Sequence, residues 1–176
     1  MARGKNFQFV LLLTGLELTH SIVLIRPFRL GDEPALHAVF HSAVHEIAAG
    51  RYSPEQLEAW APTHYDAGQW AERIRRIQPF VAEIDGQPVG YADLQANGYI
   101  DHFFVAAAHA RQGVGQSLMN HILKLAAQRR MTRVQAHVSL SAEPFFARNG
   151  FAVVARQTVT RRGVLLDNAL MERMLA

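Results

Sequence analysis

The chain contains 176 residues, of which 49% are hydrophobic and 19% are charged, and its formal net charge is +3. This length and composition are typical of one folded domain and exclude an intrinsically disordered chain. The basic residues are scattered in short pairs, so no basic stripe indicates a nucleic-acid-binding protein. The absence of cysteine excludes disulfide bonds, thiolate nucleophiles and cysteine-based zinc sites. We identify no ligand pair among the nine histidines and therefore expect no metal site.

Residues 1–20 are interpreted as an extension of uncertain role. Arg3 and Lys5 precede an apolar run at residues 7–16, as at the front of a secretory signal. The run is shorter than the roughly 20 residues that span a bilayer, and no small-x-small cleavage site follows it. An export signal is the alternative. We favour a dispensable extension on a cytoplasmic protein whose domain covers residues 21–176.

The first half of the domain predicts one strand followed by helices. Residues 22–28 form the expected strand, and residues 32–34 (Asp-Glu-Pro) carry the signals of a helix start. Apolar residues then recur at helical spacing over residues 36–47. Residues 53–56 form a capping box with proline at the first helical position. A further helix is expected over residues 70–77.

The second half predicts a meander, two helices, a strand and a hairpin. Residues 80–84, 89–94 and 99–105 are apolar runs joined by Asp-Gly and Asn-Gly, which favour type I′ turns. A three-stranded antiparallel meander is therefore expected. The remaining elements are expected as a helix over residues 113–130, a strand over 134–138, a short helix over 142–149 and a hairpin of residues 153–160 and 164–174.

A glycine-containing loop follows the third meander strand. Gly113 and Gly115 bracket one residue where the helix begins. A helix N-terminus offers unpaired N–H groups to phosphate, and glycine lets phosphate oxygens approach the backbone. Arg111 would add positive charge and Gln112 a neutral donor. Alternatively, the glycines only relieve crowding at a helix start. The antiparallel context counts against a nicotinamide site.

At this loop the chain resembles the GCN5-related N-acetyltransferase superfamily. Members carry Arg/Gln-x-x-Gly-x-Gly/Ala between the fourth strand and the following helix, where backbone amides hold the pyrophosphate of coenzyme A. Residues 110–115 match both glycines, but Ala110 stands at the first position and the basic residue comes one place later, at Arg111. This departure weakens a side-chain contact more than the backbone cradle.

The resemblance continues after the loop. The family's strand, frequent Asn and helix reading Ala-x-x-Phe-Tyr before Gly-Phe correspond to residues 134–151, with Ser139 for the Asn and Phe146 for the Tyr. Residues 52–60 are similar to a bacterial subgroup of uncharacterised acetyltransferases, the YafP-like proteins. The order of elements over residues 22–175 also matches.

The resemblance implies an α+β fold with a mixed, mostly antiparallel central sheet of about seven strands, flanked by helices and splayed between the fourth and fifth strands. It implies an N-acetyltransferase domain over residues 21–176 that moves the acetyl group of acetyl-CoA to a primary amine by direct attack on the thioester, without metal. The acceptor would be a small-molecule or peptide amine, and a homodimer is one option. A CoA-binding sensor or scaffold with weak catalysis is the alternative, and a tRNA-directed protein is a third, against which the scattered charge counts.

The same resemblance places the cofactor contacts on the strand, the loop and two later positions. The implied residues are Phe103, Phe104, Val105, Ala110, Arg111, Gln112, Gly113, Val114, Gly115, Gln116, Ser117, Ser139 and Phe146.

The catalytic candidates lie on the strand before the loop. Attack on a thioester needs a neutral amine and hence a base. Tyr99 and Asp101 share a face in a regular strand. Tyr99 stands where some family members carry a catalytic Glu, and Asp101 is the only carboxylate on that face. Alternatively, Asp101 is a hydrogen-bonded surface residue. His102 points to the other face unless a bulge intervenes, and a packed structural histidine is its alternative.

A general acid is the missing part, because Phe146 cannot donate a proton. His137 and Ser139 are weak substitutes that fit structural roles as well. Glu83 would either reach the cleft or be an exposed carboxylate. In the early helices, Tyr52 and Trp60 are candidates for the acceptor pocket wall, whereas we expect Trp70 in the core.

Overall fold

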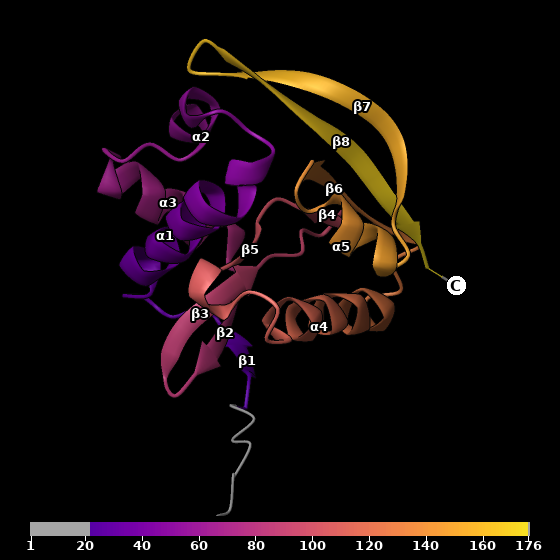
Figure 1. The fold of residues 1–176 in the computed structure, drawn as a ribbon. Coiled ribbons are helices and arrows are strands. Elements are labelled where there is room, and N and C mark those ends of the chain that lie inside the picture. The colour runs from indigo at the N-terminus through magenta and orange to yellow at the C-terminus, as the bar shows by residue number, and fades with distance from the viewer. Residues whose placement is uncertain (1–21, 176) are drawn as a thin grey trace, which may run out of the picture.

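The structure is a computed structural model that describes residues 22–175, so the expectation for residues 1–20 concerns residues outside the described range. The helices and strands follow one another as shown in Figure 1. In chain order they are β1 Leu24–Pro27, α1 Glu33–Ser42, η1 Ala43–Ile47, η2 Ala48–Gly50, α2 Pro54–Trp60, α3 Ala67–Ile77, β2 Phe80–Ile84, β3 Gln87–Ala92, β4 Tyr99–Ile100, β5 Phe103–Val105, η3 Ala107–His109, α4 Val114–Gln128, β6 Arg133–Ser139, α5 Glu143–Arg148, β7 Ala152–Arg161 and β8 Val164–Met174.

The strands form two four-stranded sheets, in the orders β1-β2-β3-β5 and β4-β6-β8-β7. Neighbours pair antiparallel except β4 and β6, which are parallel. The expected strand over residues 99–105 is divided: Tyr99 and Ile100 pair with β6, whereas Phe103–Val105 pairs with β3. The expected α+β fold and its splay are therefore confirmed. The expected single sheet is two sheets that share one interrupted segment of chain.

The expected antiparallel meander is confirmed for β2, β3 and β5, but the Asn-Gly turn diverts the first residues of its last strand to β6. Asp85 and Gly86 both have positive φ, as a type I′ turn requires, but at the next turn only Gly98 does. A Cβ at Gly98 would collide with the carbonyl oxygen of Arg133, so only glycine fits there. The Gly98 carbonyl accepts from the Gln135 amide at 2.9 Å. This close approach brings Tyr99 and Ile100 to β6 before the chain returns along β3 at Phe103.

Helices cover both faces of the first sheet. On β2 and β3, Val81 and Tyr91 pack into the core cluster that contains residues of α1, α2 and α3. Their neighbours Ala82 and Ala92 belong to the other cluster, with residues of α4 and β6. Because successive strand residues face opposite sides, the helices lie in layers on either side of the sheet. Figure 1 shows α1–α3 together on one side, α4 on the other, and the β7–β8 hairpin arching over the top.

The hairpin is tied to the early helical region by three hydrogen bonds. The Tyr52 hydroxyl donates to the Asp167 carbonyl at 2.6 Å, the Gln56 side chain to the Leu165 carbonyl at 2.8 Å, and Arg162 to the Ala59 carbonyl at 2.8 Å. Gln56 also completes the expected capping box of α2, which is confirmed. The last strands of the chain thus close against its first helices.

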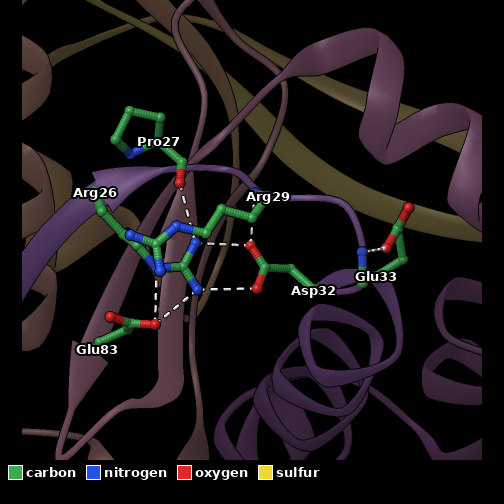
Figure 2. Close-up of polar contacts among 7 residues, drawn as sticks. Arg26, Pro27, Arg29, Asp32, Glu33 and Glu83 are labelled. Carbon is green, nitrogen blue, oxygen red and sulfur yellow. Dashed lines mark hydrogen bonds and ion pairs between the residues drawn. The ribbon is translucent and has the colours of Figure 1, made fainter.

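Buried charges join β1, β2 and the start of α1 (Figure 2). Arg26 donates to both oxygens of Asp32 at 2.7 and 2.8 Å and to Glu83 at 2.7 Å. Asp32 also accepts from the Arg29 amide at 2.8 Å. It stands at the N-cap of α1, as expected, but its side chain does not cap the helix. Glu83 is neither a cleft residue nor an exposed carboxylate, since its side chain is only 12% exposed in this pair.

Glu33, the next residue, fixes α1 to α3. Its carboxylate accepts from Arg75 at 2.7 Å and from the Gly31 amide at 2.7 Å. Its carbonyl accepts from the indole of Trp70 at 2.7 Å. Burial alone would raise the pKa of Glu33, but the hydrogen bonds that its carboxylate accepts from its own backbone amide, from Arg75 and from the Gly31 amide lower it. The two helices are therefore held at a fixed separation beside the sheet.

Replacing Arg26 with methionine should strongly destabilise the fold. The substitution keeps an unbranched side chain but leaves Asp32 and Glu83 buried without a cation, which costs about 3–5 kcal/mol. Urea unfolding followed by circular dichroism measures the loss. Arg156→Met is the matched control, because its pair with Glu143 is 62% exposed on the arginine side and should contribute little. Equal losses in the two variants would contradict this assignment.

Candidate active site

The break between β4 and β5 is organised by a carboxylate that sequence analysis missed. Asp93 follows β3 and is completely buried. One of its oxygens accepts from the amides of Asp101 at 3.0 Å and His102 at 2.6 Å. The Gln95 side chain donates to the other oxygen. Asp93 therefore satisfies the backbone donors where the chain leaves one sheet for the other.

The break turns both Asp101 and His102 toward one cavity. In a regular strand His102 would face away from Asp101, but the strand is interrupted here, so the exception that the sequence analysis allowed applies. Asp101 forms an ion pair with Arg73 of α3 at 3.2 Å. The Nε2 atom of His102 lies 3.8 Å from the Asp101 carboxylate.

The ring of His102 is held from behind by a buried tyrosine. The Tyr91 hydroxyl lies 2.9 Å from Nδ1 of His102. Burial, with the nearby charge of Arg73, lowers the pKa of His102 to about 4, so the ring is neutral at pH 7. Burial also keeps the pKa of Tyr91 well above its usual value, so the phenol retains its proton. We assign this proton to the bond with Nδ1, because the phenol has no other partner among the described residues.

The assigned tautomer of His102 makes this residue a donor and its neighbour Asp101 an acceptor. With Nδ1 accepting from Tyr91, Nε2 carries the ring proton and faces the Asp101 side. His102 is therefore a donor toward the cavity. Asp101, whose carboxylate is partly exposed, is the acceptor, as a general base must be.

Tyr99 reaches the same cavity from β4. Its hydroxyl lies 3.4 Å from Nδ1 of His137 on β6. Burial, with the nearby carboxylates of Asp101 and Asp93, raises the pKa of Tyr99, so the phenol is protonated at neutral pH. The three expected catalytic residues are thus brought together around one cavity.

The cavity has a volume of about 440 Å³, within the range of small-molecule sites. Its walls combine aromatic rings with charged and polar side chains, and they come from the early helices, the strand segments and the β7–β8 hairpin. Tyr52 and Trp60 line it as expected, and Trp70, expected only in the core, lines it as well while its ring stacks on Phe40 at 5.3 Å. The lining also includes His37, Tyr65, Phe104, His137, Ser139, Arg161 and Asp167.

The glycine loop has the backbone expected of an anion cradle. Arg111 and Gly113 have positive φ of 60° and 86°, and a Cβ at Gly113 would meet no atom within 4 Å. The first bond of α4 at this end runs from the Ser117 amide to the Gly113 carbonyl, at 2.9 Å. The amides of residues 114–116 therefore have no partner within the helix. An open helix N-terminus of this kind fits a pyrophosphate.

The side chains of the loop are less available than its amides. Gln112 donates to the Ala108 carbonyl at 3.0 Å, and Gln116 donates to Asn120 and Asn149 at 2.9 and 2.8 Å. Val114 is fully buried in the core. Ala110 and Ser117 are half-buried, and Arg111 is exposed. This arrangement agrees with a cradle made by main-chain atoms.

The strand that leads to the loop has one unpaired edge. In the described part of the chain, β5 pairs only with β3, so its other edge faces the gap toward β6. Phe104 lines the cavity, whereas Phe103 packs against Phe145 and Phe146, each with ring centroids 5.5 Å away. Phe146 is only 3% exposed. It is therefore a core residue, and its ring offers no proton to the cavity.

The expectation that the histidines contain no ligand-like pair needs a correction. His37, His41 and His45 follow one another at four-residue spacing along α1 and η1, a ligand-like pattern that our sequence analysis overlooked. The His41 and His45 rings stack at 4.1 Å. Burial lowers the pKa of His37 and His41, so both are neutral at pH 7. Within residues 22–175, no group of three or more His, Asp or Glu side chains is arranged to hold a metal ion.

Comparison with known proteins shows the family of the chain. The model of the acetyltransferase (GNAT) domain matches residues 48–169. The chain is 36% identical over 149 residues to the uncharacterised N-acetyltransferase YafP of Escherichia coli strain K12, covering 85% of this chain and 94% of YafP. The chain belongs to the GCN5-related N-acetyltransferase (GNAT) family. The expected enzyme class, an N-acetyltransferase, is confirmed with it.

Solved GNAT structures support the fold. A GCN5-related N-acetyltransferase from Rhodopseudomonas palustris is 32% identical, with a TM-score of 0.83 over 88% of this chain and 97% of that one. A putative acetyltransferase from Salmonella typhimurium, solved with its cofactor acetyl-CoA, is 20% identical, with a TM-score of 0.64 over 89% of this chain and 95% of that one.

None of the helices within residues 22–175 has the length and apolar character needed to cross a membrane.

The buried Asp93 and His102 should shape the pH dependence of stability in opposite directions. Burial raises the pKa of Asp93 from 3.8 to about 6, so the folded state binds more protons and stability falls as pH rises from 4 to 6. His102, lowered from 6.5 to about 4, makes stability rise over a similar window. Asp93→Asn removes only the first contribution. Relative to wild type, its unfolding free energy should increase by about 3 kcal/mol from pH 4 to pH 7, since each pKa unit is worth about 1.4 kcal/mol.

Urea unfolding at several pH values measures this difference. His102→Gln is the counterpart, and its unfolding free energy relative to wild type should fall over the same range. A pH-independent difference for Asp93→Asn would show that the pKa of Asp93 is the same in the folded and unfolded states, and would contradict the raised value.

Proposed function

We propose that this GNAT protein transfers the acetyl group of acetyl-CoA to a primary amine by direct attack of the amine on the thioester. The observation that carries the proposal is the unpaired edge of β5, which lies between an open helix N-terminus and a cavity with a base. Amides 114–116 and the loop around Gly113 would hold the pyrophosphate. The free edge of Phe103–Val105 would pair with the pantetheine arm.

Asp101 is the proposed base. An acceptor amine enters as an ammonium ion, and Asp101 removes one proton, directly or through water, to free the nitrogen lone pair. The Nε2–H group of His102 faces Asp101, and Arg73 forms an ion pair with the Asp101 carboxylate. Both residues therefore hold this carboxylate in place. Tyr99 orders the cavity wall through its contact with His137.

Backbone donors complete the chemistry. The nitrogen forms a bond to the carbonyl carbon, and an N–H of β5 stabilises the negative charge that develops on the carbonyl oxygen. The carbon–sulfur bond then breaks, the nitrogen gives its second proton to water, and the thiolate takes a proton from water. That proton passes either directly or through the Ser139 hydroxyl, which lines the cavity, lies 3.1 Å from that of Ser141 and regains a proton from water. Acetyl-CoA itself supplies the activated acetyl group.

The acceptor would be a small-molecule or peptide amine that fits beside the aromatic walls. The volume of about 440 Å³ suits a compact group carrying the amine. We further propose that the acetyltransferase domain covers residues 21–176 and that the protein is cytoplasmic. A homodimer stays a prediction.

A CoA-binding sensor or scaffold with weak catalysis is the second candidate. The burial of Phe146, in place of the family's tyrosine, favours it. A screen of primary amines for release of free thiol distinguishes the two, because a sensor would bind acetyl-CoA and leave it unconsumed with every amine.

Gly113→Glu should abolish acetyl-CoA binding without unfolding the protein. A carboxylate there would place negative charge in the proposed pyrophosphate cradle, and its Cβ meets no neighbour. Gly86→Glu is the matched control, because Gly86 has a similar φ of 75° and equally open surroundings, at the remote β2–β3 turn. Calorimetry should show a loss of at least about 100-fold in affinity for Gly113→Glu only. Equal binding by both variants would refute the cradle.

Asp101→Asn should lower kcat by about 100- to 10,000-fold, the usual contribution of a general base. Tyr99→Phe keeps the ring and should cost much less. Steady-state kinetics with the best amine from the screen measures both. If Asp101→Asn retains wild-type kcat while His102→Gln loses activity, His102 is the base and the tautomer assignment is wrong.

A further inference from the structure

The carboxylate of Asp93 is buried beneath the site and does not line the cavity. Burying a carboxylate costs several kcal/mol unless hydrogen bonds replace its water shell. Asp93 has these bonds: two from backbone amides and one from a side-chain amide, that of Gln95. An apolar residue at this position would leave the amides of Asp101 and His102 without their acceptor. The role of the carboxylate therefore lies in the main chain that it holds.

The two backbone amides are the donors that the break leaves without a strand partner. Ile100 is the last residue paired with β6, and Phe103 is the first paired with β3. Asp101 and His102 lie between them, and both donate to the same oxygen of Asp93. The Asp93 amide in turn donates to the His102 carbonyl at 3.1 Å. A single side chain thus takes the place of a strand over two residues.

We propose that Asp93 is a positioning residue for acetyl transfer, which holds the main chain of Asp101 and His102 so that both side chains face the acceptor cavity. The inference rests on the proposed function of Asp101 as base. Without the Asp93 acceptor, residues 101–102 would gain hydrogen bonds by continuing a strand along β3 or β6. Asp101 and His102 would then project to opposite faces of that strand, and the unpaired edge of β5 would be lost.

Asp93 acts through its oxygen as an acceptor and not by carrying a proton. Its titratable neighbours are Asp101 and His102 on the held segment and the phenols of Tyr91 and Tyr99, while Arg73 pairs with Asp101 from α3. An asparagine at this position keeps an oxygen for both amides, and the Gln95 amide can turn to accept from its nitrogen. A leucine has a similar shape and no acceptor. The pair Asp93→Asn and Asp93→Leu therefore separates the acceptor from the charge.

The first readout needs no substrate. Hydrogen exchange at the amides of Asp101 and His102, measured by NMR on the free protein, should be at least about 100-fold faster in Asp93→Leu than in wild type. Exchange at Tyr91 in the adjacent strand serves as the internal reference. Asp93→Asn should restore slow exchange at both amides. Slow exchange in Asp93→Leu would overturn the proposal, because another group would then hold the segment.

The second readout is kinetic. Asp93→Leu should lower kcat by at least about 100-fold and weaken acetyl-CoA binding in calorimetry, whereas Asp93→Asn should recover kcat to within about fivefold of wild type. If Asp93→Leu does not fold, Asp93→Ser, whose hydroxyl is too short to reach both amides, takes its place with the same expectations. A loss of activity in Asp93→Asn with slow amide exchange intact would overturn the proposal, because the charge would then be needed.

A wild type that acetylates no amine refutes the proposed function by itself. The exchange rates and the acetyl-CoA affinities of the Asp93 variants still decide whether Asp93 holds the segment.

Discussion

The segment of residues 99–105 serves two sheets at once, and the arrangement of the site follows from this constraint. Its first two residues extend the sheet of β6, and its last three extend the sheet of β3. The donors between them need an acceptor in the interior, because an unpaired buried amide is costly. Asp93 provides it. The gap between the sheets, the free edge of β5 and the shared orientation of Asp101 and His102 all depend on this carboxylate.

The charged contacts at the start of α1 extend the same organisation to the helices. Arg26 binds this helix start to β1 and β2, and Glu33 binds it to α3. Arg73, which pairs with Asp101, comes from α3, so the position of the proposed base depends on where this helix sits. Buried ion pairs add little net stability compared with apolar packing, but they define one geometry because a shifted helix would leave a charge unpaired.

Sequence analysis succeeded where structure follows from neighbouring residues. Three features depend on contacts within a few positions of the chain. The capping box of Ser53 and the Asp85-Gly86 turn are confirmed, and the loop around Gly113 has the positive φ that its glycine favours. The break at Asp101 depends on Asp93, just after β3, and on a close approach of Gly98 to β6, neither of which has a local pattern. In the sequence, Asp93 looks like an ordinary polar residue within the strand expected over residues 89–94. Only the register of the sheets shows that it is buried beneath the site.

The closure of the β7–β8 hairpin against the early helices has a consequence for synthesis on the ribosome. The glycine loop and the divided strand precede the hairpin in the chain, so a nascent chain can form them first. The cavity, in contrast, is completed by residues such as Arg161 and Asp167, which are synthesised after the loop and the divided strand. A chain that stalls before β7 would lack one wall of the cavity, together with Ala169 and Met171 of β8, which pack in the core with α4. The cavity is therefore complete only after the hairpin has been synthesised.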